Sequence, residues 1–144
     1  MAGLLLVLAS CSGTKPGTLG LTDSGLAPCP ASPNCVSSNA TDSDHGVAPL
    51  ILAVAPEDGW RAAREAVSRL PRTRIVVDTG SYLHAECSSA LLGFVDDLEL
   101  HLPGGAGAIA VRSASRLGYS DMGVNRRRVD ELRSDLQRSG TCAR

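Results

Sequence analysis

The chain has 144 residues, of which 43% are hydrophobic and 20% are charged, and its formal net charge is −1. That length suits one folded domain and is short for two, and the composition is unlike that of a disordered chain. An aromatic content of 3% and the lack of a basic excess argue against nucleic-acid binding, which relies on basic surfaces and stacking aromatic rings. We therefore expect a single domain and no nucleic-acid partner.

The first residues of the chain indicate export. An apolar run, Leu4–Leu8, leads into Leu8-Ala9-Ser10-Cys11, which resembles the bacterial lipobox, where a cysteine after small residues receives a lipid. Met1–Gly3 contains no Lys or Arg, whereas signal peptides usually begin with basic residues, so an ordinary apolar N-terminus is the alternative. We predict a signal peptide and lipobox over residues 1–11 and lipidation at Cys11. The protein would then be lipid-anchored in the bacterial cell envelope, facing the periplasm or the exterior.

The cysteines agree with export. If Cys11 carries lipid, an even set remains, Cys29, Cys35, Cys87 and Cys142, and such a set in an oxidising compartment predicts disulfides. Four cysteines allow three pairings. The proline-stiffened segment between Cys29 and Cys35 predicts a local bridge, and a Cys87–Cys142 bridge would then tie a strand to the C-terminus. There is no C-x-x-C pair and the histidines are scattered, so we predict neither a metal nor another cofactor.

The N-terminal half is predicted to contain a tether, a rigid loop and a helix. Residues 12–27 are rich in Gly, Thr and Ser without periodicity, which predicts a flexible tether in front of a single domain over residues 28–140. Prolines stiffen the loop Pro28–Ser38, because proline fixes φ and keeps the preceding residue extended. Pro49–Val54 is a possible short strand. Pro56–Leu70 is predicted as a helix, with proline at its first position and one apolar stripe.

Four strands and a second helix follow. The predicted strands are Arg74–Asp78, Tyr82–Cys87, Leu92–Leu102 and Ala108–Arg116, and the closing helix is Asn125–Arg138. Short connections favour antiparallel neighbours. We therefore predict an α+β fold: a four-stranded antiparallel meander with two helices packed on one face, in the order helix, four strands, helix. The other face of the sheet would be open to water or to a partner.

Three motifs resemble a known family. They are Pro28-Cys29-Pro30 with Ser32–Ser38, then Gly93–Asp97, then Arg112–Arg116 running into Asp121, Gly123, Asn125, Arg126 and Arg128. Together they resemble domain-of-unknown-function family 1499 of bacteria and plastids, in the expected order and over residues 28–138. The resemblance implies no activity, and it marks these residues only as candidates. A lipobox is not a general feature of that family.

The pattern of alternation predicts which of these side chains meet. If Pro103–Gly105 closes a hairpin, Asp97 lies opposite Arg112 to within one residue. Asp97, Glu99 and His101 then share a sheet face with Arg112 and Arg116. The apolar face receives Asp96, which there needs a partner, and Ser113 and Ser115 fall on the same side.

The start of the last helix carries three consecutive arginines. Arg126–Arg128 lie where the helix dipole is already positive, which disfavours each cation by ~0.3–1 kcal/mol relative to an acidic residue. An anion is expected to offset this charge. It is either an internal carboxylate, from Asp96, Asp97 or Asp121, or a phosphate or carboxylate bound to the free N–H groups of the first turn. Asp121 and Asn125 could instead order the turn and cap the helix.

These observations lead to one interpretation and two alternatives. We predict a binding or scaffold module that holds an anionic small molecule or a lipid headgroup. Its polar cluster would consist of Asp96, Asp97, Arg112, Ser113, Ser115, Arg116, Asp121, Asn125, Arg126 and Arg128. The first alternative is a hydrolase with Asp96 and Asp97 as acid and base and Ser113 or Ser115 as nucleophile. The second is a purely structural interaction protein, in which the same charges are only salt bridges.

Overall fold

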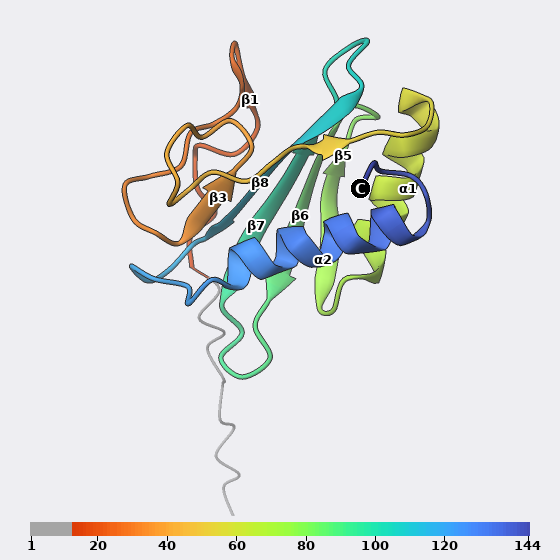
Figure 1. Ribbon diagram of the computed structural model, residues 1–144. Helices are drawn as coiled ribbons and strands as arrows, with labels where there is room; N and C mark the ends of the chain where they lie inside the picture. Colours follow the sequence, from red (N-terminus) through yellow and green to blue (C-terminus); the bar gives the residue numbers. More distant parts are fainter. Residues whose placement is uncertain (1–12) are drawn as a thin grey trace, which may run out of the picture.

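The structure is a computed structural model that describes residues 13–144, so the lipobox and Cys11 lie outside the described residues (Figure 1). Two helices and eight strands occur in the described part. They are β1 Leu21–Thr22, β2 Gly25–Leu26, β3 Cys35–Ser37, β4 Leu50–Ile51, α1 Pro56–Arg69, β5 Thr73–Asp78, β6 Tyr82–Ser88, β7 Val95–His101, β8 Ala108–Ser115 and α2 Val124–Arg138. No helix in this part is long and apolar enough to cross a membrane.

The sheet confirms the α+β class but is larger than predicted. Strands β5, β6, β7 and β8 pair in sequence order, each antiparallel to the next. Two short strands, β3 and β4, also pair antiparallel with β8, which gives six strands in the order β3-β8-β7-β6-β5 with β4 on β8. Strand β4 lies within Pro49–Val54, which was predicted as a possible short strand but not as part of the sheet. Strand β3 was not predicted, because a strand of three residues carries no periodic signal. Both strands satisfy backbone groups that β8 would otherwise leave unpaired at an edge.

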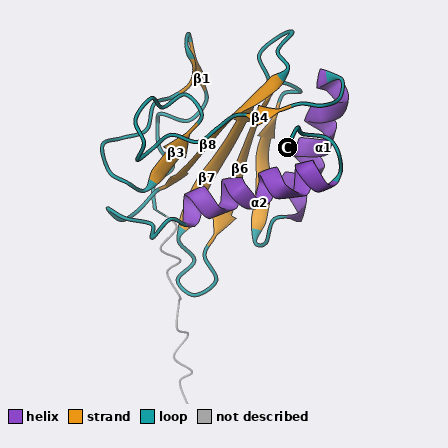
Figure 2. Cartoon of the chain, viewed as in Figure 1, coloured by secondary structure: helices purple, strands orange, loops and turns teal. Residues whose placement is uncertain are grey.

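Both helices cover one face of the sheet (Figure 2). The sheet contributes every second residue of its strands to this core, as period-two alternation requires. From the helices come Trp60, Ala63, Ala66, Val67, Val129, Leu132 and Leu136, and from the sheet come Val36, Leu50, Leu83, Ala85, Cys87, Leu98, Leu100, Ile109 and Val111. We call this side the helix face. The start of α1 and the end of α2 lie where they were predicted, and the end of α1 and the start of α2 each differ by one residue.

The β7–β8 hairpin has a register two residues away from the predicted one. Glu99 pairs with Arg112, and Asp97 pairs with Ala114. The shift arises because the connection runs from Leu102 to Gly107, beyond the predicted Pro103–Gly105 turn. A shift of two residues preserves side-chain parity, so every residue of β7 and β8 keeps its predicted face.

The opposite face is not open, because the N-terminal segment covers part of it. We call residues 13–30 the strap and this side of the sheet the strap face. Strand β2 contacts β7 and β8, and the Gly20 N–H donates a hydrogen bond to Glu99 across 2.8 Å. Residues 12–27 were expected to be a flexible tether, yet residues 13–27 pack here. Figure 1 shows the red-to-orange strap beside β3 and β8, at the end of the sheet away from α1.

Two of the four cysteines after residue 12 form a disulfide and two do not. Cys29 and Cys35 are bonded, as predicted, with their Cα atoms 5.7 Å apart. Because Cys35 pairs with Ala114 on the strap face, this bond fastens the end of the strap to β3. Cys87 and Cys142 are buried free thiols, so the second bridge is absent.

Candidate functional site

The predicted cluster divides into two sets on opposite faces of the sheet. Asp97, Arg112 and Arg116 lie on the strap face. The helix-face set consists of Asp96, Ser113, Ser115, Asp121, Asn125 and Arg128. Consecutive strand residues point to opposite sides of a sheet, so Asp96 and Asp97 cannot share a substrate as an acid and base pair. The structure therefore does not assemble the catalytic pair of the hydrolase alternative.

The helix-face set joins the start of α2 to the sheet. Arg128 Nη2 donates to Asp96 Oδ2 across 2.6 Å, and Arg128 Nη1 donates to Asn125 Oδ1 across 2.7 Å. Asn125 is fully buried, accepts the hydroxyl hydrogen of Ser113 and donates through Nδ2 to Ser115. Asp96 is therefore neutralised by a cation from the helix, as its position among apolar residues required.

The N-terminus of α2 already holds an internal anion. Asp121 Oδ1 accepts the Gly123 N–H, and Asp121 Oδ2 accepts both the backbone N–H and the side-chain Nδ2 of Asn125, all within 2.9 Å. Burial opposes ionisation, but these donors outweigh it and lower the pKa of Asp121. The carboxylate thus occupies the place where an external phosphate was one predicted option.

The three consecutive arginines go to three different places. Arg128 pairs with Asp96, whereas Arg126 donates to the carbonyl oxygens of Asp44 and Gly46 and so holds the loop before β4. Arg127 donates to the carbonyl oxygen of Met122. Arg126 therefore lies apart from the other nine predicted residues, because side chains on adjacent helical positions diverge by about 100°.

A second network lies beneath the strap, and Asp97 is at its centre. Arg116 donates two hydrogen bonds to Asp97, from Nε across 2.9 Å and from Nη2 across 2.7 Å. His84 Nε2 donates to Asp97 Oδ1 across 2.7 Å, and Arg116 also reaches Glu86 across 2.7 Å. Burial disfavours the Asp97 carboxylate, yet Arg116 and His84 lower its pKa; the hydrogen bond from Arg116 to Asp97 raises the pKa of the guanidinium.

Glu99 is the second buried carboxylate of the strap face and is fully enclosed. It accepts three hydrogen bonds, from the Tyr82 hydroxyl across 2.7 Å, the Gly20 N–H across 2.8 Å and Arg112 Nη1 across 2.8 Å. Burial, and then the hydrogen bond to Glu99, raise the pKa of Tyr82. One of these donors belongs to the strap, so the strap is part of the network.

Arg112 is the member of this network with a buried donor that has no partner among the described residues. Its residue is 4% exposed, and its Nε–H is buried without a partner among the described residues. The ion pair with Glu99 uses Nη1 only. A buried donor without a partner costs about 1–3 kcal/mol. Arg112 also lines a partly open cavity of about 330 Å³, to which the strap contributes one wall. Lining this strap cavity are Pro16, Thr18, Pro28, Cys29, Pro30, Asp97, Arg112, Ala114 and Ser115.

Comparison with known proteins identifies the family of the chain. Residues 25–136 match the family model described as a protein of unknown function (DUF1499). The chain belongs to the DUF1499 family. Comparisons with curated proteins and with solved structures gave no match. In this DUF1499 domain the family match begins at Gly25, in the strap hairpin, so Gly20 and the first half of the strap precede the matched range.

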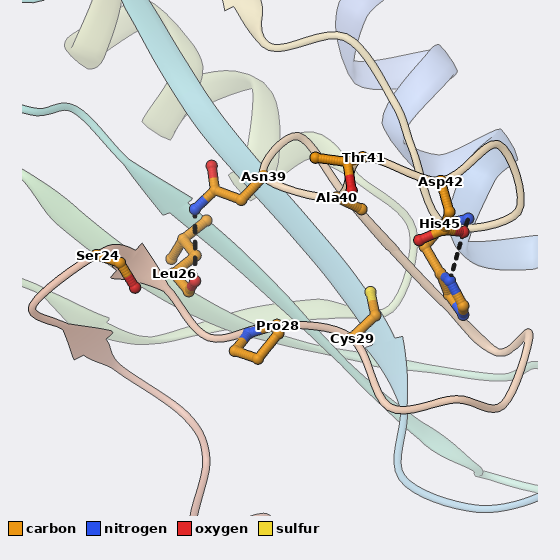
Figure 3. A pocket seen from close by; sticks show the side chains of 9 residues that line it. All are labelled: Ser24, Leu26, Pro28, Cys29, Asn39, Ala40, Thr41, Asp42 and His45. Atoms are coloured by element: carbon orange, nitrogen blue, oxygen red, sulfur yellow. Dashed lines mark hydrogen bonds and ion pairs between the residues drawn. The ribbon is translucent and has the colours of Figure 1, made fainter.

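A larger cavity, of about 580 Å³, lies on the other side of the strap (Figure 3). Figure 3 shows Leu26 of the hairpin beside Asn39, with Asp42 and His45 paired farther along the same loop. His45 Nδ1 lies 2.8 Å from Asp42 Oδ1, and its Nε2 lies 3.2 Å from the carbonyl oxygen of Ser32. The hydrogen bond to Asp42, against a small effect of burial, raises the pKa of His45. Both ring nitrogens face acceptors, which favours the protonated ring.

Sequence reasoning left four polar residues of the strap-face network out of the predicted cluster, namely Tyr82, His84, Glu86 and Glu99, although it had placed Glu99 on the same face as Arg112 and Arg116. The alternation of β6 had placed the first three on one side of the strand. The available signal was that this polar row on β6 lies opposite the polar row of β7 that contains Asp97 and Glu99, which indicates a shared network. Within the described residues no group of His, Cys, Asp and Glu could hold a metal ion.

Proposed function

We propose that this DUF1499 protein is a binding module whose strap cavity takes a small carboxylate or phosphate group, with Arg112 as the residue that recognises it. One observation carries the proposal: within the described part of the chain the Arg112 Nε–H is buried without a partner, in a side chain that lines a partly open cavity. Every other guanidinium beneath the strap is engaged by carboxylates. A ligand oxygen is the simplest group that satisfies the remaining donor.

The chemistry of the cavity favours an anion. Nε and Nη2 form one edge of the planar guanidinium, and that edge matches the two oxygens of a carboxylate or phosphate. The walls include three prolines and Cys29 of the Cys29–Cys35 disulfide, so much of the lining is apolar. Low local polarity strengthens a charge-assisted hydrogen bond. Asp97 also borders the cavity, but its oxygens already accept hydrogen bonds from Arg116 and His84.

We further propose that the protein is lipid-anchored through Cys11 in a bacterial cell envelope. The lipobox-like sequence before Cys11 supports this. The Cys29–Cys35 disulfide is consistent with an oxidising compartment. Fatty-acid labelling of wild type and Cys11→Ala in cells tests the anchor: the variant should carry no label and should be held less firmly in the membrane fraction than the wild type. Equal retention of an unlabelled wild type and variant would contradict it.

A thermal-shift titration tests the cavity. We expect the melting temperature to rise with the logarithm of phosphate or acetate concentration above the dissociation constant. Chloride at matched ionic strength controls for screening. Arg112→Lys keeps a cation for Glu99 but loses the guanidinium edge, so it should fold and lose the anion-specific shift.

A second readout reports on the atom itself. The ¹⁵N and ¹H resonances of Arg112 Nε should move on anion addition, because a new acceptor changes that N–H directly. The Arg116 Nε resonance is the internal control, since that atom already donates to Asp97. Equal melting shifts in chloride and phosphate, with an unmoved Arg112 resonance, would refute the proposal and leave a purely structural network.

A further inference from the structure

Large hydrophobic side chains are exposed at one end of the domain. Six of the eleven exposed large hydrophobic residues in the described part lie in the β6–β7 loop and in the β8–α2 loop. They are Leu91, Leu92, Phe94, Leu117, Tyr119 and Met122, and we call them the apolar end. Leu91 is 95% exposed and Met122 is 87% exposed, so neither helps to build the core.

The sheet register brings these two loops together. Ser88, the last residue of β6, pairs with Val95, and Ser115, the last residue of β8, pairs with the adjacent Asp96. Both loops therefore leave the sheet at the same end of its strands, as Figure 1 shows. The Ser89 N–H donates to the Phe94 carbonyl oxygen across 2.8 Å, which closes the base of the first loop and leaves its leucines at the tip.

The chain enters the domain at the same end. Gly13, the first described residue, packs so closely there that a Cβ on it would lie 3.1 Å from Leu117 Cγ and from Arg116 Cβ. The segment that carries Leu4–Leu8 and Cys11 therefore joins the domain beside the apolar end.

Two arginines without carboxylate partners flank the loops. Arg72 and Arg127 are exposed, and within the described residues their side chains donate only to the carbonyl oxygens of Ser88 and Met122. Both line a hollow of about 340 Å³ between the β6–β7 loop and α2, where Glu131 is the lining carboxylate. Cations beside exposed apolar tips match a surface of phosphate headgroups over hydrocarbon.

We infer that the apolar end docks on the surface of a lipid bilayer. Leu91, Leu92 and Met122 insert below the headgroups, and Arg72 and Arg127 lie at the level of the phosphates. Protruding loop tips suit insertion into lipid better than they suit a protein interface, which needs a complementary surface packed at interior density. Docking orients the domain against the membrane to which Cys11 would hold it. The inference concerns the folded domain and does not depend on the strap cavity.

Vesicle flotation tests the inference without the lipid anchor. Full-length Cys11→Ser protein is mixed with phosphatidylglycerol and phosphatidylcholine vesicles and floated through a density gradient. We expect it to float. The variant that also carries Leu91→Ser, Leu92→Ser and Met122→Ser should show a partition coefficient lower by at least about tenfold, because three inserted apolar side chains are lost.

A matched variant controls for exposed hydrophobicity in general. Leu21, Ile51 and Val54 are exposed by 47%, 48% and 39% and lie outside the two loops. Their triple serine variant, again with Cys11→Ser, should float like the parent. The leader segment is common to all three proteins, so its contribution cancels, and melting curves confirm that each is folded. A parent that fails to float, or equal flotation by the parent and the loop variant, would overturn the inference; a parent that does not float would point to a protein partner.

Discussion

Asp96 and Asp97 are neighbours in β7, yet their carboxylates form ion pairs on opposite faces of the sheet. Asp96 meets Arg128 from α2 across 2.6 Å, and Asp97 meets Arg116 across 2.7 Å beneath the strap. The surroundings also differ, because the Asp97 side chain is 1% exposed and that of Asp96 is 12% exposed. One dipeptide therefore joins the sheet to α2 on one face and links β7 to β6 and to the end of β8 on the other.

We expect Asp97→Asn to destabilise the fold by about 3–5 kcal/mol, because it leaves Arg116 buried with only Glu86 as a charged partner. Asp96→Asn should cost less, about 1–3 kcal/mol, since Arg128 retains Ser113 and Asn125 as hydrogen-bond partners and some access to solvent. Urea unfolding of both variants gives the comparison. Equal losses would show that the two networks contribute alike.

Alternation along the strands made part of this arrangement predictable. Period-two patterns in β7 and β8 assigned Asp96 and Ser113 to the helix face and Asp97 and Arg112 to the strap face, and the structure agrees. The register was wrong by two residues, because a loop containing Pro103 and three nearby glycines offers several turn lengths and the hydrophobic pattern fixes only parity.

The strap was not predictable, because nothing in its own sequence is periodic. Its position depends on backbone groups such as the Gly20 N–H and on the disulfide at Cys29, whereas residue type reports mainly on side chains. The sequence likewise could not predict that the Arg112 Nε–H would be buried without a partner among the described residues. Among residues 13–144 its Nε is buried without a partner, while its Nη1 donates to Glu99, and this arrangement is a property of the packed structure.

Asp121→Ala should destabilise the protein by about 0.5–2 kcal/mol, since the N–H groups of Gly123 and Asn125 lose their acceptor at the start of α2. Asp130→Ala, an exposed position in the same helix, is the matched control and should change stability little. Thermal unfolding measures both. Equal effects would assign the loss to helix charge and not to the cap.

Removal of the disulfide should loosen the strap. Cys29→Ser with Cys35→Ser is expected to lower the free energy of unfolding by about 2 kcal/mol, the chain-entropy value for so short a loop. The more specific expectation is faster hydrogen exchange at the Gly20 amide, which Glu99 protects in the intact protein. The Val67 amide, within α1, should exchange faster only by the amount that global stability falls. Unchanged protection of Gly20 would show that the strap holds its place without the bond.

His45 should make the stability of the strap side depend on pH. Its pKa is raised above the ordinary value of 6.5, first by the hydrogen bond to Asp42, while Asp44 adds attraction and Arg126 approaches the same loop through carbonyl oxygens. A group whose pKa is raised on folding stabilises the fold fully below its unfolded pKa, and that stabilisation is lost as pH rises through the folded pKa.

Asp42 acts in the opposite sense: its pKa is lowered from 3.8, so its contribution to stability is lost as pH falls through the folded pKa. The free energy of unfolding should therefore be highest between these limits, near pH 5 to 6, and fall toward pH 8. His45→Gln should flatten the decline above pH 6, as measured by urea unfolding at each pH. A variant that declines as steeply as the wild type would assign the pH dependence to another group.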